Sequence, residues 1–261
     1  MAQTVLVTGA SSGIGQATAQ LLAQHGYTVF GTARKPAAAQ SSGVKMVALD
    51  VCSDDSVRAC VNQVGQIDVL VNNAGYALMG AAEETSVAEA KAQLETNFFG
   101  VVRMVNAVLP AMRKAGGGKI INIGSLAGLT AIPFGAFYTA SKFALEGYAE
   151  ALWHELRPFG IHVTLIEPGF VHTAIGESTQ VAAAPLAPYD GVRQRATGAL
   201  GRQVQHGMPP EAVAMAVLRA IKSRSPSLRY PVGRDATWFP RLKSALPWPL
   251  FAVGVRRTFA V

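Results

Sequence analysis

The chain has 261 residues, of which 50% are hydrophobic and 15% are charged. This composition supplies enough apolar side chains for a buried core and excludes a mainly disordered chain, and the length fits one α/β domain. The net charge is +7, but no nucleic-acid-binding pattern accompanies it, so we expect no nucleic-acid partner.

Cysteine usage and the N-terminal residues bear on the compartment. Cys52 and Cys60 are the only cysteines, which is too few for a disulfide framework, and no Cys/His cluster offers a four-ligand metal site. The chain does not start with a basic segment followed by an apolar run, and its longest late apolar stretch is too short to span a bilayer. We therefore expect a cytoplasmic protein without a metal ion.

Short runs rich in β-branched residues alternate with segments of helical periodicity. Strands are predicted at 4–8, 28–32, 44–49, 67–71, 119–124, 161–167 and 228–232. Helices are predicted at 13–25, 53–64, 87–114, 137–157 and 210–223. This alternation is typical of a parallel sheet covered by helices. The sequence therefore predicts an α/β fold over 1–261, a single-domain, doubly wound (Rossmann) seven-stranded parallel sheet with helices on both faces.

The segment 174–209 falls outside this alternation. It is rich in Ala, Pro, Gln and Gly and shows no periodicity. Such a length is unusual for a plain connection in a compact domain. The segment is therefore predicted to be either a substrate lid or a flexible surface insertion.

The C-terminal tail, residues 236–261, combines large apolar side chains with basic ones. Residues 222–261 hold eight basic residues and a single acidic one, Asp235. This composition suits a peripheral contact with an anionic membrane. Packing on the lid or on a neighbouring subunit is the preferred alternative, because Pro240, Pro247 and Pro249 prevent one continuous amphipathic helix.

A glycine-rich turn follows the first predicted strand, in the sequence Thr-Gly-Ala-Ser-Ser-Gly-Ile-Gly at 8–15. Glycines let the backbone turn tightly and approach a pyrophosphate, which then lies at the positive end of the following helix. We therefore predict a dinucleotide-binding loop. Its expected contacts are Gly9, Ser11, Ser12, Gly13, Ile14 and Gly15.

The end of the second predicted strand is expected to meet the adenosine ribose. An acidic residue at this place would bind the 2′-hydroxyl of NAD, whereas an arginine would accommodate the 2′-phosphate of NADP. The sequence here is Gly-Thr-Ala-Arg-Lys at 31–35, without a carboxylate. Arg34 offers a planar set of donors to a phosphate. We therefore predict that NADP(H) is preferred over NAD(H).

Tyr138 and Lys142 are four residues apart in a predicted helix and so share one face. Ser125 precedes the tyrosine by thirteen residues and lies at the carboxyl edge of the sheet, where such folds bind ligands. A nearby ammonium favours a phenolate, so Lys142 is expected to lower the pKa of Tyr138 and allow proton transfer near neutral pH. Ser125 is expected to hydrogen-bond the substrate oxygen.

Together these motifs resemble the short-chain dehydrogenase/reductase family over roughly residues 3–235. The matching residues are 8–15, Leu49-Asp50-Val51, Asn72-Asn73-Ala74-Gly75, Asn97, Ser125, Tyr138-x-x-x-Lys142, Pro168-Gly169 and Thr173. The strings Val-Phe-Gly-Thr-Ala-Arg and Asn-Ala-Gly-Tyr look most similar to 17β-hydroxysteroid-dehydrogenase-like and retinol-dehydrogenase-like members.

The resemblance implies roles for further residues. Asn97 would hold a water molecule in a proton relay through Lys142, which would also contact the nicotinamide ribose. The cofactor contacts that it implies are Asp50 and Val51 at the adenine, Asn73, Ala74 and Gly75 at the ribose, Val171 and Thr173 at the carboxamide, and also Tyr138, Lys142, Pro168 and Gly169. The resemblance also suggests a homodimer or homotetramer built on the helices at 87–114 and 137–157.

Apolar side chains dominate the region around the expected site: Tyr76, Leu78, Met79, Leu126, Leu129, Phe134, Phe137 and Phe170. We therefore expect an NADP(H)-dependent carbonyl reductase or alcohol dehydrogenase for a bulky apolar substrate, steroid-, retinoid- or acyl-like. Two alternatives stay open. A non-catalytic cofactor-binding regulator would be expected to have lost Tyr138 or Lys142, and a lyase or epimerase would use the cofactor only transiently.

Overall fold

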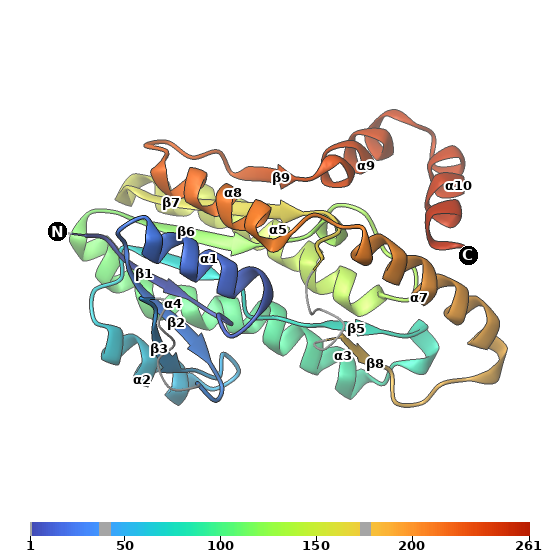
Figure 1. Cartoon of the computed structure of the whole chain (residues 1–261), viewed down its shortest axis with the longest axis horizontal. Helices are drawn as coiled ribbons and strands as arrows, with labels where there is room; N and C mark the ends of the chain where they lie inside the picture. Colours follow the sequence, from blue (N-terminus) through green and yellow to red (C-terminus); the bar gives the residue numbers. More distant parts are fainter. Residues whose placement is uncertain (1, 37–42, 173–178) are drawn as a thin grey trace.

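Seven strands form the central sheet of the computed structural model, which describes residues 2–36, 43–172 and 179–261 (Figure 1). The strands are β1 (Thr4–Val7), β2 (Thr28–Ala33), β3 (Lys45–Ala48), β4 (Val69–Asn72), β6 (Gly118–Ile123), β7 (Ile161–Pro168) and β9 (Arg229–Val232). Their order is β3-β2-β1-β4-β6-β7-β9, and every neighbouring pair is parallel. The predicted doubly wound, single-domain fold is confirmed.

Helices cover both faces of the sheet because its central strands are apolar on both sides. Along β1, Val5 and Val7 pack in one buried cluster with Leu22, whereas Leu6 packs in the opposite cluster with Leu145. The first face carries α1 (Gly13–Gln24) and α8 (Pro210–Lys222), which lie side by side in Figure 1. The second face carries α2 (Asp54–Val64), α4 (Gly100–Ala115) and α5 (Ala136–Leu156).

The helix predicted at 87–114 has a different geometry in its middle. It consists of α3 (Val87–Leu94), a π-helical turn η2 (Glu95–Phe99) and then α4. The π-turn inserts an extra residue into the helical repeat and so changes the direction in which the side chains around it point. Asn97 lies in the middle of this turn.

The segment 174–209 is more regular than we expected. Thr179–Val181 forms strand β8, which pairs in parallel with β5 (Ala77–Met79), and Asp190–Gln205 forms helix α7. The short 3-10 turns are η1 (Ala82–Glu84), η3 (Leu126–Gly128), η4 (Arg157–Phe159) and η5 (Ala187–Tyr189). The described part of this segment therefore forms a strand and a helix although its sequence shows no periodicity. Residues 174–178 of the segment lie outside the described residues.

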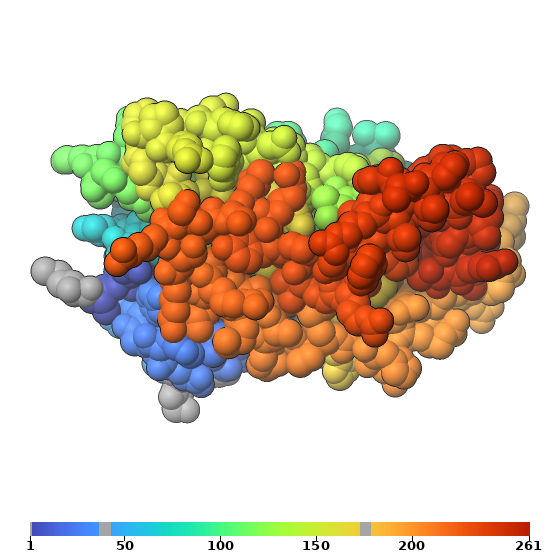
Figure 2. All heavy atoms as spheres, turned by 90° about the horizontal axis from the view of Figure 1, so that it is seen from above, coloured from blue at the N-terminus to red at the C-terminus, as the bar shows by residue number. Residues whose placement is uncertain are grey.

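The tail forms two helices, α9 (Arg234–Ala245) and α10 (Trp248–Phe259), separated at Leu246 and Pro247. The tail is thus not one continuous helix, as the prolines predict. Pro240 is accommodated inside α9, so the break falls at Pro247. Both helices gather at the end of the molecule that carries α7 (Figure 2). None of the helices in the described ranges is long and apolar enough to cross a membrane.

Candidate active site

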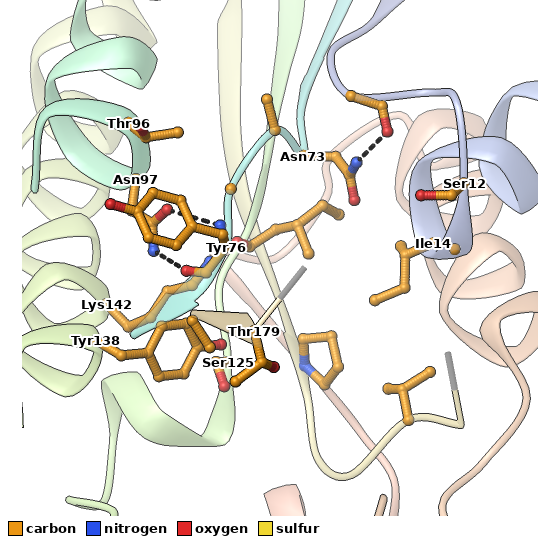
Figure 3. A pocket seen from close by; sticks show the side chains of 18 of the residues that line it. Ser12, Ile14, Asn73, Tyr76, Thr96, Asn97, Ser125, Tyr138, Lys142 and Thr179 are labelled. Carbon is orange, nitrogen blue, oxygen red and sulfur yellow. Dashed lines mark hydrogen bonds between the residues drawn. The ribbon is translucent and has the colours of Figure 1, made fainter. Parts of the chain in front are cut away.

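A cavity of about 640 Å³ runs along the carboxyl ends of the strands. It lies where the strand order reverses between β1 and β4, the place at which open α/β sheets bind ligands. The loops after β1, β2, β3, β4, β6 and β7 line it, together with residues of α5 and α7. In Figure 3, Ser125, Tyr138 and Lys142 lie on one side of the cavity and Ser12 and Ile14 on the other.

The loop after β1 closes one end of this cavity. Gly9 and Gly13 have positive φ angles of 66° and 56°, which favour glycine. A Cβ on Gly15 would lie 2.2 Å from the Gly9 carbonyl oxygen. Of the predicted loop contacts, Gly9, Ser11, Ser12, Gly13 and Ile14 line the cavity, whereas Gly15 is buried and lets the helix approach the loop.

The same loop is attached to the end of β4. Nδ2 of Asn73 donates to the carbonyl oxygens of Thr8 and Gly9 at 2.9 and 3.0 Å. The Thr8 hydroxyl oxygen accepts from the N–H groups of Asn73 and Ala74 at 2.9 and 3.0 Å. The amino end of α1 has no acidic residue in its first turn. These features fit the pyrophosphate of a dinucleotide cofactor.

The adenosine end has one cationic and one acidic side chain. Arg34 is exposed at the end of β2 and lines the cavity with Asp50 and Val51. One carboxylate oxygen of Asp50 accepts from the N–H of Cys52 at 2.9 Å. Among the described lining residues no carboxylate comes from β2 or the loop after it, so this end offers the guanidinium of Arg34 to an anionic group.

Helix α5 brings Tyr138 and Lys142 to the end of β6. The Nζ of Lys142 donates to the carbonyl oxygen of Ile123 at 2.8 Å and lies 5.9 Å from the centre of the Tyr138 ring. Ser125 follows β6 directly, and its hydroxyl oxygen accepts from the N–H of Ala127 at 3.0 Å. The spacing of these residues along the sequence thus places three polar groups at one point of the cavity wall.

Burial sets the protonation of this pair. It raises the pKa of the Tyr138 phenol, and a hydrogen bond with Ser125 opposes this shift without reversing it. Burial lowers the pKa of Lys142 to about 8, whereas the nearby Glu146 carboxylate raises it. Our expectation of a lowered pKa for Tyr138 is therefore wrong, because desolvation of the phenolate outweighs the hydrogen bond with Ser125. Tyr138 keeps its proton at neutral pH.

Asn97 connects the π-turn to two neighbouring elements. Its Oδ1 accepts from the N–H of Tyr76 at 3.1 Å, and its Nδ2 donates to the Tyr76 carbonyl oxygen at 3.0 Å and to the Ser141 hydroxyl at 3.2 Å. The Ser141 hydroxyl in turn donates to the carbonyl oxygen of Tyr138 at 2.7 Å. Asn97 thereby positions the chain after β4 against α5. Its role in a water relay stays a prediction.

Two buried carboxyl groups behind Lys142 were not predicted from the sequence. Glu146 lies one helical turn beyond Lys142, and its side chain hydrogen-bonds that of Glu167 on β7. The Nε of Arg229 lies 3.2 Å from Glu146 Oε2 and 3.4 Å from Glu167 Oε1. Burial raises the pKa of Glu167 to about 8, so the two acids share a proton at neutral pH. The four-residue spacing from Lys142 to Glu146 was the available signal.

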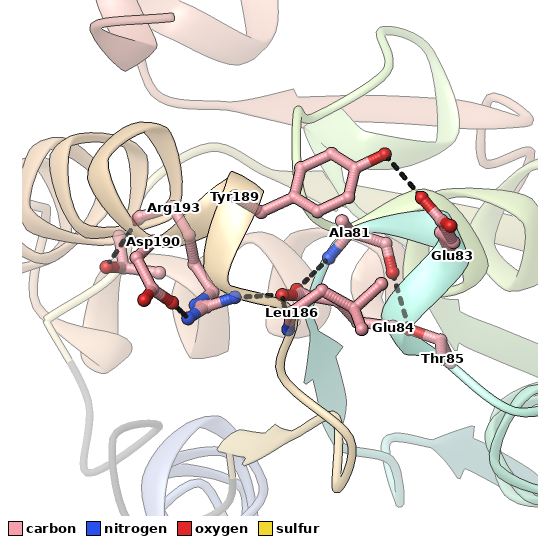
Figure 4. A network of polar contacts seen from close by, with 9 residues as sticks. Ala81, Glu83, Glu84, Thr85, Leu186, Tyr189, Asp190 and Arg193 are labelled. Carbon is pink, nitrogen blue, oxygen red and sulfur yellow. Dashed lines mark hydrogen bonds and ion pairs between the residues drawn. The ribbon is translucent and has the colours of Figure 1, made fainter.

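A third buried carboxyl group, that of Glu84, holds the start of α7. Glu84 accepts from the N–H groups of Ala81 and Leu186 at 2.8 and 2.9 Å and pairs with Arg193 of α7 (Figure 4). The Tyr189 hydroxyl donates to Glu83 at 2.9 Å. These contacts attach the start of α7 to η1. Later in the same helix, Leu200 and Val204 line the cavity.

The apolar lining agrees with the prediction only in part. Tyr76, Met79, Leu126 and Phe170 line the cavity, together with Ile132, Leu200 and Val204, which were not predicted. Four of the expected residues do not line it: Leu78, Leu129, Phe134 and Phe137. The turn at Phe134, whose φ is 59°, places its ring against Tyr189 instead.

Six of the remaining predicted cofactor contacts line the cavity, and a seventh is not among the described residues. Asn73, Ala74, Gly75, Pro168, Gly169 and Val171 line the cavity. Thr173 lies outside the described residues. The cavity therefore holds a phosphate loop, a cationic adenosine end and a Ser-Tyr-Lys group, which together define an oxidoreductase with a nicotinamide cofactor.

Known proteins resemble this chain over almost its whole length. The family model "short chain dehydrogenase" matches residues 3–183. The chain is 40% identical to a 3-ketodihydrosphingosine reductase of Bacteroides thetaiotaomicron, over 99% of this chain and 98% of that protein. It is 39% identical to human retinol dehydrogenase 8 (87% and 80% covered) and 37% identical to human 17-beta-hydroxysteroid dehydrogenase type 1 (88% and 77%). The chain belongs to the short-chain dehydrogenase/reductase family.

Solved structures agree with this assignment. A short-chain dehydrogenase from Streptomyces avermitilis superposes with a TM-score of 0.84 at 34% identity, covering 94% of this chain and 93% of that one. A family member from Burkholderia phymatum in complex with NAD gives 0.81 at 26% identity, covering 94% and 93%. A serine dehydrogenase complexed with NADP⁺ gives 0.74 at 29% identity, covering 88% and 94%. Both nicotinamide cofactors thus occur among its structural neighbours.

The Tyr138→Phe variant should lose turnover by at least about 100-fold, because it removes only the transferable proton of the phenol. Cofactor affinity should stay within about twofold, since the ring is retained, and this is measured by fluorescence titration. A kcat close to that of the parent on an accepted ketone would contradict the assignment of Tyr138 as the proton donor.

The pH dependence should report the protonation of Lys142. Because burial lowers the Lys142 pKa to about 8, its ammonium is present below that pH and is lost as the pH rises through it. The kcat/KM for ketone reduction should therefore fall above about pH 8.

A pair of variants tests whether the fall in kcat/KM at high pH comes from Lys142 or from another group. Glu146→Gln removes the carboxylate that raises the Lys142 pKa, so the alkaline limb of kcat/KM should move to lower pH. Glu150→Gln is the matched control, because Glu150 also pairs with Arg229 but is exposed. An unmoved limb in Glu146→Gln, or equal shifts in both variants, would contradict this interpretation.

Proposed function

We propose that the protein is an NADP(H)-dependent reductase that interconverts a ketone and a secondary alcohol on a long or bulky apolar substrate. The observation that carries this proposal is the uneven lining of the cavity. Its charged side chains, among the described residues, are Arg34 and Asp50 at the adenosine end and Lys142 beside Tyr138. The rest of the substrate end is mainly apolar, with Met79, Leu126, Ile132, Phe170, Leu200 and Val204, and the polar residues Thr179 and Gln180 that also line the cavity are uncharged.

The side chains around Tyr138 supply the proton chemistry of this reaction. A bound nicotinamide cofactor would supply the hydride in reduction and accept it in oxidation. Tyr138 holds its proton at neutral pH and donates it to the substrate oxygen, and Ser125 hydrogen-bonds the same oxygen. The Lys142 ammonium stabilises the phenolate that remains. In oxidation the phenolate accepts the proton instead.

The relatives support a lipid-like substrate. The names of the similar proteins refer to 3-ketodihydrosphingosine, retinol and a 17-hydroxysteroid, all of which are largely apolar. In this chain, Leu200 and Val204 of α7 close the apolar end, and the Glu84–Arg193 contact holds that helix in place. We assign residues 179–206 as the wall, and so the lid, of the substrate end.

The preference for NADP(H) rests on Arg34. An exposed guanidinium at the end of β2, with no carboxylate on that strand or the loop after it among the described lining residues, suits a 2′-phosphate and leaves a 2′-hydroxyl without an anionic acceptor. We further propose a cytoplasmic homodimer or homotetramer that packs on the continuous segment α3-η2-α4 and on α5, where Phe99 of η2 and Phe143 of α5 are exposed.

Replacing Arg34 tests the cofactor preference. A charge-assisted contact contributes about 1.5–3 kcal/mol, so Arg34→Ala should reduce kcat/KM for NADPH by roughly ten- to a hundredfold. The value for NADH should change by less than about threefold, because NADH lacks the phosphate. Equal use of NADPH and NADH by the parent enzyme would refute the proposal.

A substrate series tests the apolar substrate end. With NADPH and ketones of increasing alkyl length, kcat/KM should rise by about fourfold per methylene until the cavity is filled, because each buried methylene contributes about 0.8 kcal/mol. Leu200→Asp should flatten this rise while leaving the rate on the shortest ketone nearly unchanged. A preference for short or charged ketones in the parent enzyme would refute the proposal.

A further inference from the structure

The two tail helices expose a cluster of large apolar side chains. The described residues include twelve large hydrophobic side chains that are exposed, and six of them lie within 238–253. We call these six the tail patch: Trp238, Leu242, Leu246, Trp248, Leu250 and Val253. Trp248 and Leu250 are the most exposed of the six, at 65% and 62%. Half of the exposed large apolar residues are therefore concentrated on one small part of the molecule.

The patch lies on particular faces of its helices. Trp238, Leu242 and Leu246 follow one another at steps of four residues along α9 and its end. On α10, Leu250 and Val253 are three apart, so they too share a face. The exposed face of α10 with Leu250 and Val253 is therefore different from the face that α10 packs against the rest of the protein.

The packing face of α10 is already occupied by the protein itself. Phe251 and Phe259 are buried, and Phe259 lies edge-on to Phe170 with ring centres 6.4 Å apart. The Nε of Arg195 in α7 donates to the carbonyl oxygen of Ala260 at 3.4 Å. Since Phe170 also lines the cavity, the tail is attached directly to the wall of the substrate end.

Positive charge surrounds the tail patch. Arg241, Arg256 and Arg257 lie on the same two helices, and the Arg241 guanidinium is 5.4 Å from the centre of the Trp238 ring. Asp235 is the only acidic side chain in 222–261, and it accepts a hydrogen bond from the N–H of Phe170 at 2.7 Å. The charges that the tail offers outward are therefore cationic.

A second copy of the chain would fit this surface poorly. A symmetric dimer through the tail patch would bring together two surfaces that both carry Arg241, Arg256 and Arg257, and like charges across an interface are unfavourable. An anionic bilayer complements both properties, because tryptophan and leucine enter the headgroup boundary while arginines contact lipid phosphates.

We propose that the tail patch binds the surface of an anionic phospholipid bilayer and holds the substrate end of the cavity beside it. Binding itself depends on α9 and α10 alone. The consequence for catalysis rests on the proposed function, because only an apolar substrate would be delivered from the lipid. The contact between Phe259 and Phe170 makes the distance from the bilayer to the cavity wall short.

Vesicle flotation of the full chain tests this proposal. The protein should float with vesicles of equimolar phosphatidylcholine and phosphatidylglycerol at low salt, and binding should weaken as salt screens the arginines. The double variant Trp248→Ser, Leu250→Ser should bind at least about tenfold more weakly, because burial of a single leucine contributes about that factor. The control pair Phe159→Ser and Met215→Ser changes exposed apolar residues outside the patch and should bind like the parent.

Activity measurements separate docking from the reaction itself. On a water-soluble ketone without vesicles, the parent, the double variant and the control should have the same kcat/KM. On a long-chain ketone dissolved in the anionic vesicles, the double variant should be slower than the parent by at least about fivefold. If no ketone is reduced but flotation behaves as expected, the proposed function fails and the docking surface stands.

Three results would overturn the docking surface. The first is that the parent stays with the unbound fraction at low salt. The double variant could float as well as the parent, which would place binding elsewhere. The third is that the parent does not bind vesicles and the double variant has a different mass from the parent in light scattering. This result would show that a second copy covers the tail patch.

Discussion

The hydrogen bond from Lys142 to the carbonyl oxygen of Ile123 joins helix α5 to the end of strand β6, and the arrangement of the site depends on it. A buried ammonium is costly unless other groups compensate it. Here the compensation comes from one carbonyl oxygen and from the Glu146 carboxyl one turn further along the helix. The helix face therefore carries phenol, ammonium and carboxyl in succession, and the carboxylate of Glu146 opposes the lowering of the Lys142 pKa by burial.

The two ends of the cavity are built by different means. At the phosphate end, backbone groups and the Asn73 amide fix a loop whose glycines leave room for a ligand. At the substrate end, side chains of α7 and Phe170 form an apolar wall that is attached to η1 by Glu84 and to the tail by Phe259. The first part has the features that fit a cofactor pyrophosphate, and under the proposed function the second part selects the substrate.

The sequence predicted the sheet and the Ser-Tyr-Lys group because both depend on local patterns. Apolar runs such as the one ending in Val7 identify buried strands, and four-residue spacing identifies a shared helix face. Helix α7 was missed because its glycines and few apolar residues give no periodicity, and its stability comes from contacts such as Glu84 with Arg193. The π-turn at Asn97 and the carboxyl pair of Glu146 with Glu167 likewise depend on residues far apart in the chain.

Arg229 becomes available late during translation, after both of the carboxyl groups that it pairs with. Glu146 and Glu167 are translated before it, and Arg229 follows Glu146 by 83 residues on the last strand of the sheet. While the nascent chain still lacks Arg229, the two carboxyls can enter the interior only with protons attached or remain in water. The ion pairs of these two carboxyls with Arg229 therefore form last. A nascent chain that ends before β9 has every residue of the Ser-Tyr-Lys group, but it lacks the cation that pairs with Glu146 and Glu167.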